Sequence, residues 1–144
     1  MIDNVSVREV MSKNPITLHP KETIDKANLL FKEMDIHHIP LVVMNKVVGI
    51  LSLGDLLCID SLKNRNLDKH FSNKIIGVST LDDIMTPNPI CINDSSTLEL
   101  AIETMIENRI NCLPIIDDEN EIVGLITTHD INKFLLKELK NQIA

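Results

Sequence analysis

The stretch GILSLGD, residues 49–55, decides the fold, because it returns as GLITTHD at residues 124–130. In both copies an apolar run that begins with glycine ends in a hydroxyl residue, and an aspartate follows three residues later. A short apolar run of this kind predicts a buried strand. The S/T-x-x-D pattern after the run predicts the start of a helix. The chain therefore carries the same strand-to-helix junction twice.

The repetition extends outward from this junction over nearly the whole chain. VREVMSKNPITL at residues 7–18 returns as LDDIMTPNPICI at residues 81–92, and HHIPLV at 37–42 returns as NCLPII at 111–116. A repeat unit of this length is a supersecondary block. Two related halves tend to bury their apolar faces against each other, and ligand clefts commonly form at such a seam.

Each half predicts the element order β-α-β-β-α, which gives an α/β (α+β) fold of two repeats packed about a pseudo-two-fold axis. The expected elements are opening helices that end at Met11 and Met85, first strands at 16–18 and 90–92, amphipathic helices that begin near Thr23 and Thr97, hairpins of 39–43 with 47–51 and 113–116 with 122–126, and closing helices from Leu53 and Thr128. We expect repeat 1 over residues 5–60, a polar linker over 61–79 and repeat 2 over 80–140.

Composition excludes several functional classes. The chain has 144 residues, a formal net charge of −7, no Trp or Tyr and no visible basic patch, which argues against a nucleic-acid partner. Its apolar runs are too short to span a bilayer, and the first residues do not form a signal peptide, so we expect a cytoplasmic protein with no membrane partner. The three cysteines are scattered and suit a reducing compartment.

Ser52 with Asp55 and Thr127 with Asp130 are the most informative polar pairs, and two interpretations of them are open. Each pair matches a capping box, which satisfies backbone N–H groups at the start of a helix. Alternatively, a carboxylate beside a helix N-terminus can accept hydrogen bonds from the two hydroxyls of a ribose. The two roles compete only in part, because a carboxylate has about four lone-pair sites.

These motifs together give the chain a family resemblance. It resembles a tandem pair of CBS domains, the Bateman module, through Met11-x-x-Asn-Pro15, Met85-x-x-Asn-Pro89, the Ile-Pro40 and Leu-Pro114 strands and two intact G-h-h-[ST]-x-x-D motifs. The resemblance implies clefts between the repeats that bind an adenosyl ligand such as AMP, ADP, ATP or S-adenosylmethionine. It also implies a homodimer that pairs through helical faces, and it implies ribose binding by Ser52, Asp55, Thr127 and Asp130.

The resemblance further places phosphate contacts at His37 and His38, before the first Ile-Pro strand. The matching Asn111 and Cys112 carry no charge, so we expect the better nucleotide cleft to join Thr127 and Asp130 with the two histidines. Weaker phosphate candidates, by position, are His129 and Arg109. The base-pocket candidates are Thr17, Cys91, Ile39, Pro40, Leu113 and Pro114.

The sequence argues against catalysis. It lacks zinc-ligand spacing, a P-loop, a G-x-S-x-G motif and a glycine-rich dinucleotide loop, so we expect no metal, no catalytic cofactor and no enzyme activity. We expect a regulatory module that senses an adenosyl ligand. The alternatives are a ligand-free dimerisation module, or a separate regulatory subunit of an enzyme or transporter that the sequence does not name.

Overall fold

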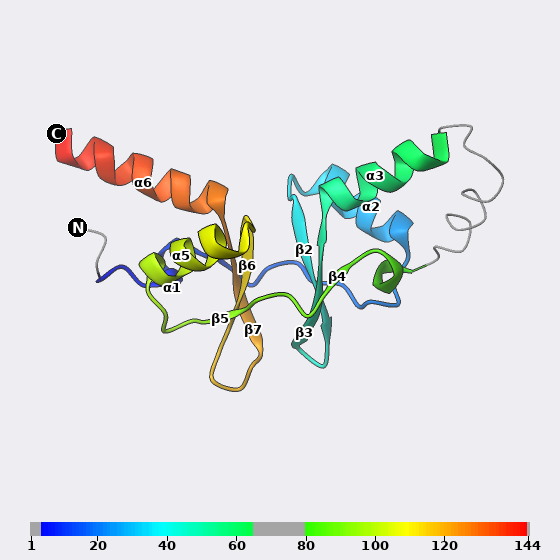
Figure 1. The fold of residues 1–144 in the computed structure, drawn as a ribbon, viewed down its shortest axis with the longest axis horizontal. Coiled ribbons are helices and arrows are strands. Elements are labelled where there is room, and N and C mark those ends of the chain that lie inside the picture. The colour runs from blue at the N-terminus through cyan, green and yellow to red at the C-terminus, as the bar shows by residue number, and fades with distance from the viewer. Residues whose placement is uncertain (1–3, 65–79, 144) are drawn as a thin grey trace. The chain divides into compact units, whose positions relative to one another are not determined.

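A computed structural model describes residues 4–64 and 80–143 of the chain (Figure 1). The fold is α+β, as predicted, and the chain divides into two compact units. Unit 1 consists of Met1–Pro15 with Ile90–Ala144, and unit 2 consists of Ile16–Pro89. Each unit has its own sheet and its own apolar core.

Unit 2 is built on a three-stranded antiparallel sheet with the order β2-β3-β4. The strands are β2 (His38–Val43), β3 (Lys46–Ser52) and the short β4 (Thr86–Pro87). Its helices are α2 (Ile24–Glu33), α3 (Leu53–Asn64) and the 3-10 helix η2 (Leu81–Asp83). Fully buried Ile39, Leu41 and Leu51 from the hairpin meet Leu81 of η2 in one core.

Unit 1 repeats this plan on a four-stranded sheet with the order β1-β7-β6-β5. The strands are β1 (Ser12–Lys13), β5 (Ile92–Asn93), β6 (Cys112–Ile116) and β7 (Ile122–Thr127). The helices are α1 (Val7–Val10), α5 (Leu98–Asn108) and α6 (Thr128–Ile143). The blue helix α1 lies beside α5 in Figure 1, and its Val7 is fully buried in the core of the unit.

The amphipathic helices begin where the sequence predicts. Thr23 caps α2 by accepting a hydrogen bond from the Lys26 N–H at 3.3 Å, and Thr97 caps α5 by accepting one from Leu100 at 3.2 Å. The buried faces are also confirmed: Ile24, Ala27 and Phe31 on α2, and Leu98, Ala101 and Met105 on α5. Periodic apolar residues together with a hydroxyl cap therefore fixed both helices.

Both predicted hairpins are confirmed as antiparallel pairs, β2 with β3 and β6 with β7. The first hairpin turns at Met44 and Asn45, whose φ values of 51° and 65° are those of a left-handed turn. The closing helices begin at Leu53 and Thr128, and α6 runs without a break to Ile143.

Two local predictions were wrong. Residues 16–18 and 90–92 do not form strands as expected: in the first stretch only Leu18 makes a bridge, to Leu41, and in the second the strand starts at Ile92. The opening helix of repeat 2 is a three-residue 3-10 helix. Helix α3 continues to Asn64, so residues 61–64 of the expected linker are helical, and the rest of that linker lies outside the described residues.

The opening segment of each repeat belongs to the unit formed mainly by the other repeat. We define the opening segments as residues 6–13 and 80–87. Strand β1 pairs with β7, so that Ser12 lies opposite Leu125, and β4 pairs with β3, so that Thr86 lies opposite Ile50. The chain passes from one unit to the other at the two Asn-Pro motifs, where Asn14 and Asn88 have φ values of 48° and 46°.

Candidate ligand-binding site

The two S/T-x-x-D motifs lie at equivalent strand-to-helix junctions. Ser52 is the last residue of β3 and Thr127 is the last residue of β7, and a helix begins at the next residue in each case. Asp55 and Asp130 therefore lie in the first helical turn, where unpaired backbone N–H groups make the surroundings favourable to negative charge. All four side chains belong to partly exposed residues.

The capping interpretation is confirmed in both motifs. Asp55 Oδ2 accepts a hydrogen bond from the Ser52 N–H at 2.9 Å, and Ser52 Oγ accepts one from the Asp55 N–H at 3.1 Å. The Thr127 N–H donates to Asp130 Oδ2 at 2.9 Å, and the Asp130 N–H donates to Thr127 Oγ1 at 3.2 Å. Each pair thus satisfies two backbone donors reciprocally.

Capping uses only half of each carboxylate. All bonds to Asp55 and Asp130 involve Oδ2, and within residues 4–64 and 80–143 neither Oδ1 has a hydrogen-bond partner. A carboxylate oxygen retains two acceptor sites, so each Oδ1 can accept O–H groups from outside the chain without disturbing the cap. The ribose interpretation and the capping interpretation are therefore compatible at both motifs.

The two motifs differ in how they use the hydroxyl proton. Thr127 Oγ1 donates to Asp130 Oδ2 at 2.9 Å, so this proton is held inside the motif. Ser52 Oγ accepts from Asp55 but makes no corresponding donation within the described chain. Ser52 can therefore donate a hydrogen bond outward, whereas Thr127 must first give up its bond to Asp130.

The residues before the Ile-Pro and Leu-Pro strands lie next to the motif of their own repeat. His38 is the register partner of Ser52, and the Leu53 N–H donates to the His37 carbonyl at 2.9 Å. In unit 1, Cys112 lies opposite Thr127, and the Thr128 N–H donates to the Asn111 carbonyl at 3.0 Å. His37 is exposed and His38 is half-buried. The expected cleft that joins Thr127 and Asp130 with these histidines combines residues of different units, and it stays a prediction.

Cys112 is an inert core thiol beside the motif of unit 1. Its side chain is buried at the start of β6, opposite Thr127. Burial, together with the negative charge of Asp130, raises the pKa of Cys112 to about 12. The thiol is therefore neutral at physiological pH and provides no positive or negative charge for a ligand. Burial also raises the pKa of Cys91, which lies just before β5.

The base-pocket candidates fall into two groups. Four of them are fully buried within the cores: Ile39, Pro40, Leu113 and Pro114. Thr17 and Cys91 are partly exposed and precede Leu18 and β5 respectively. The weaker phosphate candidates, Arg109 and His129, are both exposed, Arg109 as the left-handed cap of α5 with φ 54° and His129 in the first turn of α6.

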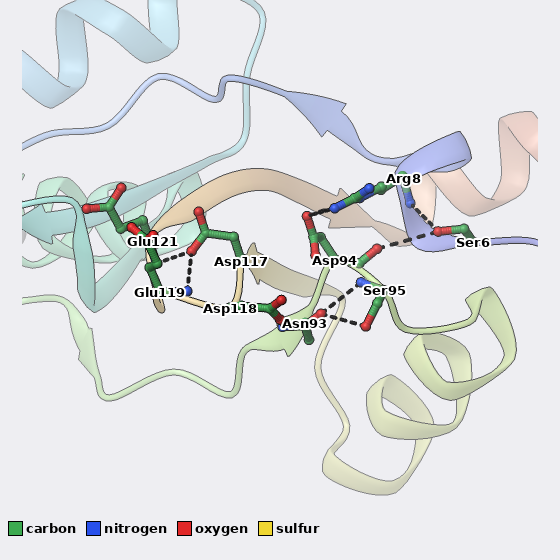
Figure 2. A network of polar contacts seen from close by, with 9 residues as sticks. All are labelled: Ser6, Arg8, Asn93, Asp94, Ser95, Asp117, Asp118, Glu119 and Glu121. Atoms are coloured by element: carbon green, nitrogen blue, oxygen red, sulfur yellow. Dashed lines mark hydrogen bonds and ion pairs between the residues drawn. The ribbon is translucent and has the colours of Figure 1, made fainter.

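Three ion pairs lie outside the motifs in the described residues, and two of them join an opening segment to a loop before a helix. Arg8 of α1 binds Asp94, a buried carboxylate in the loop before α5, and Arg8 Nε lies 3.0 Å from Asp94 Oδ2 (Figure 2). In unit 2, Lys21 Nζ lies 2.6 Å from Asp82 Oδ2. A comparison of the repeats shows opposite charges at the equivalent positions Arg8 and Asp82, but it does not reveal their partners, because Asp94 aligns with Pro20 and Lys21 aligns with Ser95.

In the described part of the chain, His, Cys, Asp and Glu do not gather into a set of three or more that could hold a metal ion. Among the described helices, none combines the length and apolar character needed to cross a bilayer.

Comparison with known proteins gives the family context. The model of the CBS domain matches residues 7–60 and 73–137. MJ1225 of Methanocaldococcus jannaschii is 31% identical over 134 residues, which cover 89% of this chain and 48% of that protein. The chain also spans only 22% and 25% of the next two curated relatives.

Two solved structures of similar fold contain ligands. CBSX2 of Arabidopsis thaliana, in complex with AMP, has a TM-score of 0.78 and 26% identity, covering 92% of this chain and 97% of that chain. The CBS domain pair of MJ0100, in complex with 5′-methylthioadenosine and S-adenosyl-L-methionine, has a TM-score of 0.77 and 25% identity, covering 93% and 98%.

Proposed function

Because the chain belongs to the CBS-domain family, we propose that it is a regulatory module that binds an adenine nucleotide or an adenosyl metabolite. One observation carries the proposal: Asp55 and Asp130 are partly exposed residues that each cap a helix through Oδ2 and keep an Oδ1 without a partner in the described residues. CBSX2 binds AMP, and MJ0100 binds 5′-methylthioadenosine and S-adenosylmethionine. All three ligands contain a ribose, whose hydroxyl groups can donate hydrogen bonds to such an oxygen.

The ligand acts by differential affinity rather than by chemistry. A ligand that contacts both repeats favours the relative arrangement in which both sets of contacts form, and it shifts the population toward that arrangement. In this proposal Asp130 and Thr127 hold the ribose, while His37 and His38 contribute to the phosphate side. The regulated partner is then an enzyme or a transporter that recognises the liganded arrangement.

Calorimetric titration tests the proposal directly. The full chain is titrated with AMP, ADP, ATP, S-adenosylmethionine, 5′-methylthioadenosine and adenosine, with GMP as the control for the base. We expect saturable binding of at least one adenosyl compound and a rise in Tm, because a ligand at about 100 times its Kd adds roughly 2.7 kcal/mol to the free energy of unfolding. No binding of any of them at millimolar concentration would leave the chain as a ligand-free module.

A second function, self-association, is favoured by exposed apolar side chains on α6. Leu136, Leu139 and Ile143 are 53%, 57% and 85% exposed, and their spacing of three and four residues puts them on one helix face. Such a stripe is typical of a helix that packs against a partner, and a closed two-fold dimer is the commonest arrangement.

Light scattering on the full chain tests this second function. We expect a mass of about twice the 16.2 kDa of one chain, and we expect Leu139→Lys to lower it. Lys137→Glu, a change next to the stripe on the same helix, is the matched control. A mass of one chain at micromolar concentration would contradict self-association.

A further inference from the structure

The opening segments, residues 6–13 and 80–87, could each pack in either of the two units. Because the chain is a repeat, each unit offers an equivalent place for either segment. In the structure, residues 6–13 lie in unit 1 and residues 80–87 lie in unit 2, so each segment packs away from the body of its own repeat. Something must distinguish the two places.

The main apolar and backbone contacts of the segments recur in both units, although the Asp82 N–H donates to the Pro20 carbonyl at 2.9 Å while the equivalent Arg8 N–H donates to Ser6 Oγ at 3.3 Å. Val7 and Leu81 are equivalent and both fully buried. The Val7 N–H donates to the Ser96 carbonyl at 3.0 Å, and the Leu81 N–H donates to the equivalent Glu22 carbonyl, also at 3.0 Å. These contacts stabilise either segment in either place, so they cannot select between the places.

The steric contact between methionine and glycine is also duplicated. Met11 lies over Gly124 of β7, and the equivalent Met85 lies over Gly49 of β3. Either methionine would fit over either glycine. This contact therefore requires that some opening segment is present, but it does not decide which one.

The charged contacts differ most between the units, and their signs are reversed. In unit 1 the segment carries the cation, Arg8, and the loop before α5 carries the anion, Asp94 (Figure 2). In unit 2 the segment carries the anion, Asp82, and the loop before α2 carries the cation, Lys21. Lys21 and Asp94 lie in equivalent loops but one position apart, since Pro20 is the equivalent of Asp94. Placing the segments the other way would bring Arg8 near Lys21 and Asp82 near Asp94.

We propose that these two reversed ion pairs direct each opening segment to the other repeat and oppose its return to its own. The discrimination has an attractive and a repulsive part, which is how closely similar alternatives are separated. Asp94 gives the repulsive part most of its weight, because it is only 7% exposed and a buried carboxylate without a cation is costly.

The pair in unit 2 acts in the same direction at the surface. The hydrogen bond from Lys21 lowers the pKa of Asp82, and Asp82 raises the pKa of Lys21. Both groups therefore stay charged over the whole physiological range. This pair is more exposed than the pair of Arg8 with Asp94, so its share of the discrimination is smaller and falls with added salt.

A disulfide competition in the full chain reads out the placement. Ser12→Cys, Leu125→Cys and Ile50→Cys are introduced after the native cysteines have been replaced by alanine. Ser12 is the antiparallel partner of Leu125, and Ile50 is the equivalent of Leu125 in the other unit. Directly opposed residues in an antiparallel pair lie within disulfide reach. After refolding in a glutathione buffer, the ratio of 12–125 to 12–50 bridges measures where the segment docks.

The decisive variant reverses the charges on the segments only, with Arg8→Asp and Asp82→Lys. We expect the ratio of 12–125 to 12–50 bridges to fall by about tenfold or more, since two attractions become two repulsions. Adding Lys21→Asp and Asp94→Lys recreates both pairs with opposite sign and should restore the original ratio. Lys13→Glu is the control, because it reverses the charge of an exposed residue in the opening segment 6–13 and leaves both ion pairs and both helix caps intact.

Two outcomes would overturn the proposal. An unchanged ratio in the segment-reversed variant would mean that the covalent connections at the Asn-Pro motifs decide the placement. If the segment-reversed variant does not fold, the fourfold variant decides instead: recovery of its folding and of the 12–125 bridge supports the proposal, and failure to recover contradicts it. The bridge ratio is measured without a ligand, so this proposal can fail while the proposed function holds, and the reverse.

Discussion

The sulfur of Met11 lies where any side chain at position 124 would have to begin. A Cβ added to Gly124 would be 2.3 Å from Met11 Sδ, 3.0 Å from Cγ and 3.1 Å from Cε. Gly49 stands in the same relationship to Met85, with the sulfur at 2.2 Å. The glycine that opens each G-h-h-[ST]-x-x-D motif is therefore explained by packing against the opening segment that pairs with that strand.

We predict that Gly124→Ala lowers the free energy of unfolding by about 1–3 kcal/mol, as overpacking of a tight site does. Three atoms of Met11 are close, so the whole side chain must move and not only its tip. Met11→Ala should relieve this cost when it is combined with Gly124→Ala. Urea unfolding of the single and double variants gives the coupling energy.

Met85→Ala combined with Gly124→Ala is the control for this cycle, because Met85 lies over Gly49. Its effects should be additive with those of Gly124→Ala. If the effects of Met11→Ala and Gly124→Ala were also additive, the contact between Met11 and the new Cβ would not be the cause of the lost stability, and the prediction would be wrong.

We predict that Asp130→Ala removes most of the stabilisation by an adenosyl ligand and also lowers the stability of the ligand-free protein by about 1 kcal/mol through loss of the cap. Thr97→Ala is the matched control, because it removes the cap of α5 and leaves both S/T-x-x-D motifs intact. The measurement is the shift in Tm on adding ligand. If Asp130→Ala behaves like Thr97→Ala, with an intact ligand shift, the motif only caps its helix. Asp55→Ala should have a smaller effect.

We predict that His37→Ala with His38→Ala weakens the binding of AMP at least several-fold and leaves the binding of adenosine nearly unchanged. A hydrogen bond to a charged group contributes about 1.5–3 kcal/mol. Asn111→Ala, at the position equivalent to His37, is the control. Titration of both ligands into each variant separates the contribution of the phosphate to the affinity from that of the nucleoside. Equal losses of affinity for AMP and adenosine would mean that the histidines shape the pocket and do not contact the phosphate.

We predict that Cys112 makes the stability fall at alkaline pH. Its pKa is about 12 in the folded chain against an ordinary value of 9.0, so the folded state holds the proton more tightly. Above pH 9 the unfolded thiol ionises first, and stability declines until the folded thiol also ionises near pH 12, by up to about 1.4 kcal/mol per pH unit.

The check on Cys112 is the difference in unfolding free energy between the wild type and Cys112→Ala, followed from pH 7 to pH 11. Cys58→Ala is the control, because Cys58 is exposed. A difference that does not change with pH would contradict the prediction. Because the sequence has no tyrosine, no phenol titrates in this range.

The local part of the candidate site could be predicted from the sequence. The S/T-x-x-D pattern gave both helix starts and both caps, because Ser52 and Thr127 contact an aspartate only three residues away. Register also follows locally in the hairpins, whose strands are joined by short turns. The pattern could not show that the cap engages only one oxygen of each carboxylate, since that depends on the geometry of the folded turn.

By itself, the sequence determined the repeat, the amphipathic helices, the hairpins and the two motifs, because each of these rests on contacts between residues that are near in the chain. Only the tertiary structure decided where the opening segments pack, since Val7 and Leu81 fit either unit and hydropathy cannot tell the places apart. The short strands β1 and β4 exist only because a distant strand receives them. The contacts of Arg8 with Asp94 and of Met11 with Gly124 hold the first opening segment in unit 1. The spacing of these residues in the sequence does not reveal the contacts, because the partners are far apart in the chain.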